Sequence, residues 1–261
     1  MPTFDSDGVR IHYREFGPQD AAPVLLLHGF ASNARVNWIS TGWTDFLAGA
    51  GFHVIAPDFP GHGDSEKLYT GERYTAPSMA RDMLRLFDHL GLRRAFVMGY
   101  SMGARVAAFL ALAHPQRICA LVLAGMADNL IHGVGGSQDI ARALLANDPD
   151  DPSIPSWARG FRQFAERTGS DRRALAACIT ASRTPLTPDD LQRLDGLPVL
   201  IVVGEEDSIA GGTDEITSLL PHAELKILPR RNHMNAVGDR AYKQAVAAFF
   251  RAHEGRCSSS A

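Results

Sequence analysis

Short apolar runs alternate along the chain with longer segments in which apolar residues recur at helical spacing. The apolar runs have the length and composition of strands in a sheet that is covered on both faces. These runs are residues 9–16, 24–27, 54–56, 95–99, 118–123, 198–203 and 223–228. Residues 76–90 and 241–253 repeat apolar side chains every three or four positions, which is typical of a helix with one buried face. The alternation predicts an α/β fold with a mostly parallel central sheet flanked by helices.

Residues 128–194 depart from this alternation. The segment has no strong strand pattern, and it combines a glycine-rich run at 133–136 with a run rich in Pro and Asp at 148–155. Helical patterns follow at residues 157–167 and 172–181. The segment is therefore predicted to be helical, unlike the chain on either side of it.

The length of this segment bears on the domain organisation. About 65 residues between two consecutive core strands are far more than an ordinary connection. We expect residues 128–194 to form a small helical cap, inserted into one discontinuous domain made of residues 1–127 and 195–254. The alternative is a plain crossover helix with a long loop. Residues 255–261 are small and polar, and we expect them to be a disordered tail.

The composition is that of an ordinary globular chain. Of 261 residues, 45% are hydrophobic and 21% are charged, which argues against a disordered or coiled-coil protein. A formal net charge of −3 gives no basis for a nucleic-acid partner or an anionic membrane surface. No stretch reaches the roughly 18 consecutive apolar residues of a membrane span, and the first residues lack a signal-peptide pattern. We expect a cytoplasmic protein with no membrane partner.

The chain has three cysteines, Cys119, Cys178 and Cys257. An odd number without C-x-x-C spacing argues against a disulfide scaffold and against a cysteine-based zinc site. We expect two packed thiols and one thiol in the tail.

Residues 99–103 read Gly-Tyr-Ser-Met-Gly, the G-x-S-x-G pattern of a nucleophile elbow. The pattern follows the predicted strand 95–99 and opens a segment with helical spacing, which is the strand–turn–helix context that the motif requires. Such a sharp turn needs small neighbours, and it lifts the side chain of Ser101 above the sheet, beside the free N–H groups of a helix N-terminus. Ser101 is therefore the predicted nucleophile.

A serine hydroxyl is a weak nucleophile until a base takes its proton and a third group orients that base. The segment Gly204-Glu205-Glu206-Asp207 directly follows a predicted strand, which places Asp207 at the sheet edge where open α/β folds build their sites. His233 lies just beyond the last predicted strand. The order Ser101, Asp207, His233 predicts a catalytic triad. The alternative acids are Glu205, Glu206 and Asp128.

With these motifs, the sequence resembles the α/β-hydrolase family over residues 9–253; in that family the nucleophile, the acid and the histidine follow one another in this order. Residues 28–30 (His-Gly-Phe) follow the second predicted strand, where that family places its oxyanion loop. The resemblance implies that the backbone N–H groups of Phe30 and Met102 form the oxyanion hole. It also implies that residues 58–65 form a mostly structural turn.

Arg105 lies about one helical turn after Ser101. Residues 99–105, Gly-Tyr-Ser-x-Gly-x-Arg, resemble the menaquinone-pathway synthase branch of this fold, whose arginine helps to hold substrate carboxylates. This resemblance implies an anionic substrate; the alternative is an arginine packed against the sheet in an ion pair. Trp38 and Trp43 lie in a long loop after the oxyanion motif, where they either line the substrate pocket or anchor the loop on the core.

His28 and His62 sit in turn motifs, and the sequence has no carboxylate cluster with ligand spacing, so we expect no metal and no cofactor. The predicted activity is that of a serine hydrolase that cleaves a small-molecule carboxylic ester. The same triad also supports lactone opening, C–C bond hydrolysis, amide hydrolysis, cofactor-free perhydrolysis and a synthase-type elimination. The alternative of another class is a ligand receptor with residual hydrolase activity.

Overall fold

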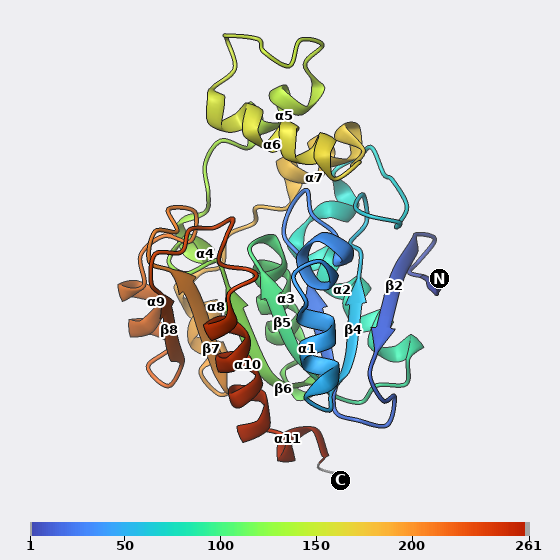
Figure 1. The fold of residues 1–261 in the computed structure, drawn as a ribbon, viewed down its shortest axis with the longest axis vertical. Helices are drawn as coiled ribbons and strands as arrows, with labels where there is room; N and C mark the ends of the chain where they lie inside the picture. The colour runs from blue at the N-terminus through green and yellow to red at the C-terminus, as the bar shows by residue number, and fades with distance from the viewer. Residues whose placement is uncertain (1, 259–261) are drawn as a thin grey trace.

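The computed structural model describes residues 2–258. Its eight-stranded sheet has the order β1-β2-β4-β3-β5-β6-β7-β8 (Figure 1). The strands are β1 (Thr3–Asp5), β2 (Arg10–Phe16), β3 (Pro23–Leu27), β4 (His53–Pro57), β5 (Ala95–Tyr100), β6 (Ile118–Ala124), β7 (Val199–Gly204) and β8 (Glu224–Leu228). The pairings β1–β2 and β2–β4 are antiparallel, and all other pairings are parallel. The predicted α/β fold is confirmed, and β1 is a short edge strand that the pattern did not predict.

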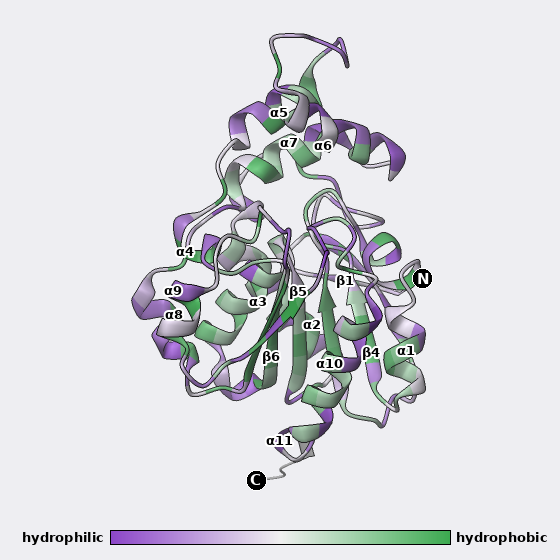
Figure 2. Ribbon diagram, turned by 60° about the vertical axis from the view of Figure 1, so that its left-hand side comes forward, coloured by the Kyte–Doolittle hydropathy of each residue, from purple (hydrophilic) through white to green (hydrophobic). Residues whose placement is uncertain are grey.

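Helices cover both faces of this sheet. They are α1 (Trp43–Gly49), α2 (Ala76–His89), α3 (Met102–Ala113), α8 (Pro188–Leu194), α9 (Asp214–Leu219) and α10 (Arg240–Ala252), with a π-helical turn at Arg35–Ile39 and 3-10 turns at Glu72–Tyr74 and Pro115–Arg117. Because side chains alternate along a strand, Val24 and Leu26 of β3 pack with α1 and α10, whereas Leu25 and Leu27 pack with α2 and α3. Figure 2 shows the hydrophobic strands enclosed between these two layers.

The segment between β6 and β7 is helical. It contains α4 (Asn129–His132), α5 (Ser137–Leu145), α6 (Ser156–Arg167) and α7 (Arg172–Ala181), followed by α8. Helices α5, α6 and α7 stand apart above the sheet in Figure 1 and share a small apolar cluster that includes Ile140, Leu175 and Ile179. By contrast, α4 and α8 pack on the main core through Leu130 and Leu191. The part that projects as a cap is therefore shorter than the segment 128–194.

The cysteine and tail predictions are wrong for the described residues. Cys119 of β6 and Cys257 are joined by a disulfide, although 138 residues separate them, and Cys178 is a buried free thiol. The partners meet because α10 returns along the sheet to the start of β6, which sequence spacing does not reveal. Residues 255–258 form a short helix, α11 (Gly255–Ser258), which lies against β6. The remainder of the predicted tail, 259–261, lies outside the described residues. Within residues 2–258, no helix combines the length and the apolar character needed to cross a bilayer.

Candidate active site

The turn between β5 and α3 carries Ser101 in a strained backbone conformation, with φ 57° and ψ −115°. This region is sparsely populated by residues other than glycine, and it is characteristic of functional turns. The two glycines of the motif make the turn possible. A Cβ on Gly99 would lie 2.1 Å from the carbonyl oxygen of Gly103, and a Cβ on Gly103 would lie 2.1 Å from that of Leu27. The sequence motif is thus explained by close packing of backbone on backbone.

Three side chains from separate loops meet above this turn. His233 Nε2 lies 2.9 Å from Ser101 Oγ, and His233 Nδ1 lies 2.9 Å from Asp207 Oδ2. The carboxylate of Asp207 is itself fixed, because its Oδ1 accepts hydrogen bonds from the N–H groups of Ile209 and Ala210, both at 3.0 Å. These distances form the continuous serine–histidine–carboxylate chain that nucleophilic catalysis requires.

The alternative acids are engaged elsewhere. Asp128 Oδ1 accepts the N–H of Ile216 at 2.8 Å, at the start of α9. Glu205 accepts the N–H of Arg230 at 2.8 Å, and Glu206 is exposed. Among the described residues, Asp207 is the only carboxylate hydrogen-bonded to His233.

The loop after β3 borders the nucleophile. A Cβ on Gly29 would lie 3.5 Å from Ser101 Cβ, so the backbone of this loop passes directly beside the serine. Phe30 and Met102 line the same cavity as Ser101. This placement agrees with backbone donors on both sides of the reacting carbonyl, and the role of those two N–H groups remains a prediction.

A cavity of about 890 Å³ lies between the core and the cap helices and opens onto the triad. Apolar side chains from both parts line most of it: Phe30, Met126, Ile140, Phe161, Phe164 and Ile179. The charged residues in its wall are Arg105, Arg167 and Arg183, and the described lining contains no aspartate or glutamate. The cavity therefore combines an apolar wall with unbalanced positive charge.

Arg105 is buried, but it does not form the ion pair that we considered as one alternative. Its guanidinium donates to the carbonyl oxygens of Leu130 at 2.9 Å, Thr184 at 2.8 Å and Asn129 at 2.8 Å. Burial, followed by the proximity of Arg183, lowers the pKa of Arg105 to about 10. Arg105 thus ties both connections of the cap to α3 while its side chain faces the cavity.

Trp38 and Trp43 do not line the cavity, which corrects the pocket role that we held open for them. Both are fully buried in the core beneath α10. The indole Nε1–H of Trp43 donates to the carbonyl oxygen of Val237 at 2.6 Å, and its ring packs edge-on against Tyr242. These residues anchor the loop after the oxyanion motif.

Sequence reasoning missed Arg183 and Arg167 as cavity residues. Arg183 donates to the carbonyl oxygens of Val134 and Gly135, and Arg167 stacks over Phe164. The signal that could have found them is the clustering of basic residues in the expected cap. That signal was ambiguous because the same segment contains a comparable number of acids.

Comparisons with known proteins agree with this geometry. Residues 22–187 match the family model described as the alpha/beta hydrolase fold. A putative 2-succinyl-6-hydroxy-2,4-cyclohexadiene-1-carboxylate synthase of Bacillus subtilis (strain 168) is 28% identical, over 87% of this chain and 89% of its own. A non-heme chloroperoxidase of Streptomyces lividans is 31% identical, over 85% and 88%. A solved 2-hydroxy-6-oxo-6-phenylhexa-2,4-dienoate hydrolase from Rhodococcus sp. strain RHA1 superposes with a TM-score of 0.75 at 25% identity, over 95% and 97%.

Proposed function

This chain belongs to the α/β-hydrolase fold family, and from that premise we propose that it is a serine hydrolase that cleaves a carboxylic ester through an acyl-enzyme. The observation that carries the proposal is the unbroken chain of hydrogen bonds from Ser101 through His233 to Asp207. The wide range of reactions among its relatives means that the fold alone does not select the bond that is cleaved.

The proposed cycle has two acyl transfers. His233 Nε2 takes the hydroxyl proton as Ser101 Oγ attacks the carbonyl carbon, and the imidazolium then protonates the leaving alcohol. Water, deprotonated by His233, attacks the acyl-enzyme, and the proton returns to Ser101 as the acid is released. Asp207 keeps the Nδ1–H tautomer of His233 and stabilises its charged form. Donation from Phe30 and Met102 N–H to the oxyanion would contribute roughly 3–4 kcal/mol per donor.

The test is hydrolysis of p-nitrophenyl acyl esters of increasing chain length by wild type, Ser101→Ala and Ser208→Ala. Ser208 is a second serine of the cavity wall and serves as the matched control. We expect steady turnover with an optimum at one chain length, a loss of at least about 1,000-fold in Ser101→Ala, and less than threefold change in Ser208→Ala. A burst of about one equivalent without turnover would instead support a ligand receptor that retains the triad.

A second candidate is favoured by the arginines of the cavity: the same triad acting on a substrate that carries a carboxylate. Arg105 and Arg183 form no ion pair with a described carboxylate, and burial lowers the pKa of both. Like charges without a counterion are costly where one is buried and the other partly buried, so an anionic ligand group would be stabilised between them. Such a substrate is compatible with ester hydrolysis and also with lactone opening, C–C bond hydrolysis or an elimination.

Paired substrates separate this candidate from the first one. The p-nitrophenyl half-ester of a dicarboxylic acid and an uncharged ester of equal length differ only in the distal carboxylate. We expect Arg183→Gln to lower kcat/KM for the half-ester by at least about tenfold, which corresponds to roughly 1.4 kcal/mol, and to change that of the uncharged ester by less than threefold. Equal losses for the two esters would reject an anionic subsite and assign Arg183 to packing of the cap.

A further inference from the structure

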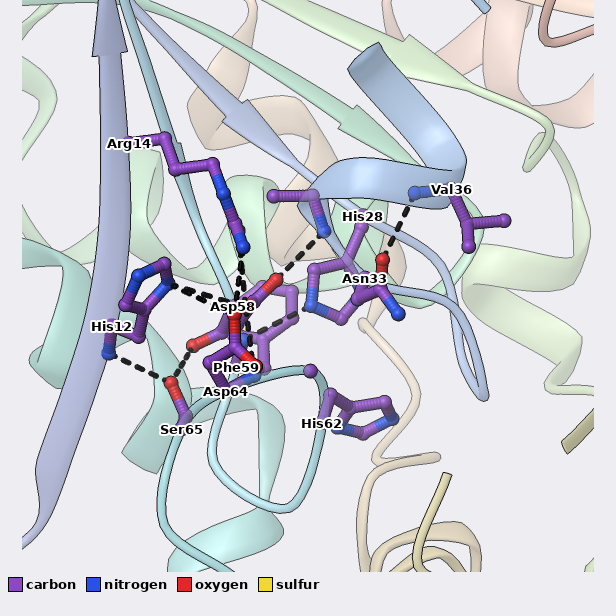
Figure 3. Close-up of polar contacts among 12 residues, drawn as sticks. His12, Arg14, His28, Asn33, Val36, Asp58, Phe59, His62, Asp64 and Ser65 are labelled. Atoms are coloured by element: carbon purple, nitrogen blue, oxygen red, sulfur yellow. Dashed lines mark hydrogen bonds and ion pairs between the residues drawn. The ribbon is translucent and has the colours of Figure 1, made fainter. Parts of the chain in front are cut away.

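A buried polar cluster lies beside the loop at residues 28–34, the loop that borders Ser101 (Figure 3). Its centre is Asp58, which directly follows β4 and is only 1% exposed. One carboxylate oxygen, Oδ1, accepts the N–H of Ala34 at 2.7 Å. The other, Oδ2, accepts the N–H of Asp64 at 2.9 Å and lies 3.4 Å from both Arg14 Nη1 and His12 Nδ1. The carboxylate therefore links three separate backbone segments.

The link to Ala34 fixes the end of the loop at residues 28–34. The start of this loop is held by a second contact with the same turn, because His28 Nε2 accepts the N–H of Phe59 at 3.0 Å. Between these anchors, Ala31 has a positive φ of 57°, a conformation that a residue other than glycine keeps only under external constraint. Thus the two ends of the loop are attached to adjacent residues, Asp58 and Phe59.

The surrounding turn is shaped to admit this carboxylate. A Cβ on Gly63 would lie 2.2 Å from Asp58 Oδ2, so a side chain at that position would displace the acid. Burial by itself would raise the pKa of Asp58, but the proximity of His28, the N–H groups of Asp64 and Ala34 and the charge of Arg14 outweigh it and hold that pKa below its usual value. Asp58 is consequently ionised when the protein is folded at neutral pH.

A metal ion is not needed to explain the cluster. One ligand atom each from His12, Asp58 and Asp64 lie within 4.8 Å of one another. However, Arg14 Nη2 is 2.7 Å from Asp64 Oδ2, and Arg14 Nη1 already faces Asp58. The guanidinium thus supplies the positive charge between the two carboxylates.

We propose that Asp58 is a positioning residue for the oxyanion hole: through its hydrogen bond to Ala34, it holds residues 28–34 at the distance from Ser101 that lets this loop stabilise the oxyanion. This inference rests on the proposed function. Asp58 does not touch the substrate; it acts through the backbone of the loop. A misplacement of about 1 Å in such a loop is enough to cost up to about 100-fold in rate.

Three variants test the proposal. Asp58→Asn keeps the shape of the side chain but replaces one acceptor with a donor. Ala34→Pro removes the N–H that donates at the other end of the same hydrogen bond. Proline fits at this position because Ala34 has a φ of −56° and lies at the start of the helical turn, where the side chain of Asn33 accepts the N–H of Val36. Asp64→Asn is the matched control, because its half-exposed side chain shares Arg14 but does not touch Ala34.

For each variant we measure KM and kcat, with the active sites counted by titration with a fluorophosphonate. We also measure inhibition by a boronic acid, which forms a tetrahedral oxyanion on Ser101. We expect Asp58→Asn and Ala34→Pro each to lower kcat by about 10–100-fold, with KM within threefold and the boronate Ki raised in proportion. The kcat of the double variant should lie no more than about threefold below that of the less active single variant, because both substitutions act on the same hydrogen bond. Asp64→Asn should stay within twofold of wild type.

If Asp58 acts in folding alone, its substitution lowers the titrated fraction of active protein but leaves kcat per site and the boronate Ki within threefold of wild type. That result overturns the proposal. So does a double variant in which the two losses of kcat multiply. If Asp58→Asn does not fold, Ala34→Pro decides by the same criteria. Absence of ester turnover in wild type would reject the proposed function but not this inference. In that case, the rates at which the fluorophosphonate labels Ser101 in wild type and in the variants still report whether the loop at residues 28–34 is correctly placed.

Discussion

Two histidines, His233 beside Ser101 and His62 in the turn after β4, differ in what their surroundings allow. His233 has hydrogen-bonding partners on both ring nitrogens, so it can accept a proton from one side while its charge is stabilised from the other. His62 is fully buried; its Nδ1–H donates to the carbonyl oxygen of Pro60, and its Nε2 has no partner. The first histidine is set up for proton transfer, whereas the second is set up to remain neutral.

The neutral state of His62 makes the stability of the protein depend on pH. Burial, followed by the proximity of His28, lowers its pKa from the ordinary 6.5 to about 3. Between these values the unfolded chain binds a proton that the folded chain excludes, so stability falls as the pH falls from about 6.5 toward 3. His62 should contribute a slope of up to about 1.4 kcal/mol per pH unit in that range. Urea unfolding at pH 7, 6 and 5 measures it.

The matched variants are His62→Phe and His132→Gln. The first removes the buried imidazole and should reduce the slope between pH 6 and 5, whatever it does to the stability at pH 7. The second removes an exposed histidine and controls for the loss of one histidine from the chain. An unchanged slope in His62→Phe would contradict the assignment.

Secondary structure could be predicted from the sequence wherever one periodicity lasts for several residues. β5 and α2 follow from apolar runs and helical spacing, and the elbow between strand and helix follows from its glycines. β1 was missed because it has three residues with a single buried side chain, Phe4. The π-helical turn at Arg35–Ile39 was missed because its buried Trp38 packs in the same core cluster as residues of α10, which is about 200 residues away in the chain.

The connections of the cap depend on one side chain of α3. Arg105 donates to carbonyl oxygens of the outgoing connection, at Asn129 and Leu130, and of the returning connection, at Thr184. Arg105→Met keeps most of the apolar stem but removes the side-chain donor from all three carbonyl oxygens, of which those of Asn129 and Leu130 keep one backbone N–H donor each. We expect the free energy of unfolding to fall by about 2–4 kcal/mol, with faster amide hydrogen exchange at residues 129–136 and 182–186.

The control for this prediction is Arg167→Met. Arg167 is an exposed arginine of the same cavity that stacks over the ring of Phe164, so its loss should change stability by less than about 0.5 kcal/mol. Exchange rates that stay at wild-type values in both cap connections of Arg105→Met would show that another contact holds the cap.

At the scale of the whole molecule, the order of the motifs was enough to predict that Ser101, Asp207 and His233 meet, because parallel strands bring their carboxyl ends to one edge of the sheet. The cavity was not predictable in the same way. Its wall takes residues from Gly29 to Val237, and their meeting depends on how the cap packs over the core. The three arginines share no spacing along the chain, so nothing in the sequence marked them as neighbours.

The disulfide is a long-range contact that sequence spacing concealed, and it closes the C-terminal helices onto the sheet. Cross-linking Cys119 to Cys257 restricts a loop of 138 residues in the unfolded chain, so it should stabilise the folded protein by about 2–4 kcal/mol. Dithiothreitol is expected to lower the melting temperature of wild type. Cys257→Ser should melt at the same lower temperature with or without reductant, which controls for other effects of the reagent. Thiol titration of unreduced, denatured wild type should find one free thiol, that of Cys178. A count of three, with no response to reductant, would restore the free thiols predicted from the sequence.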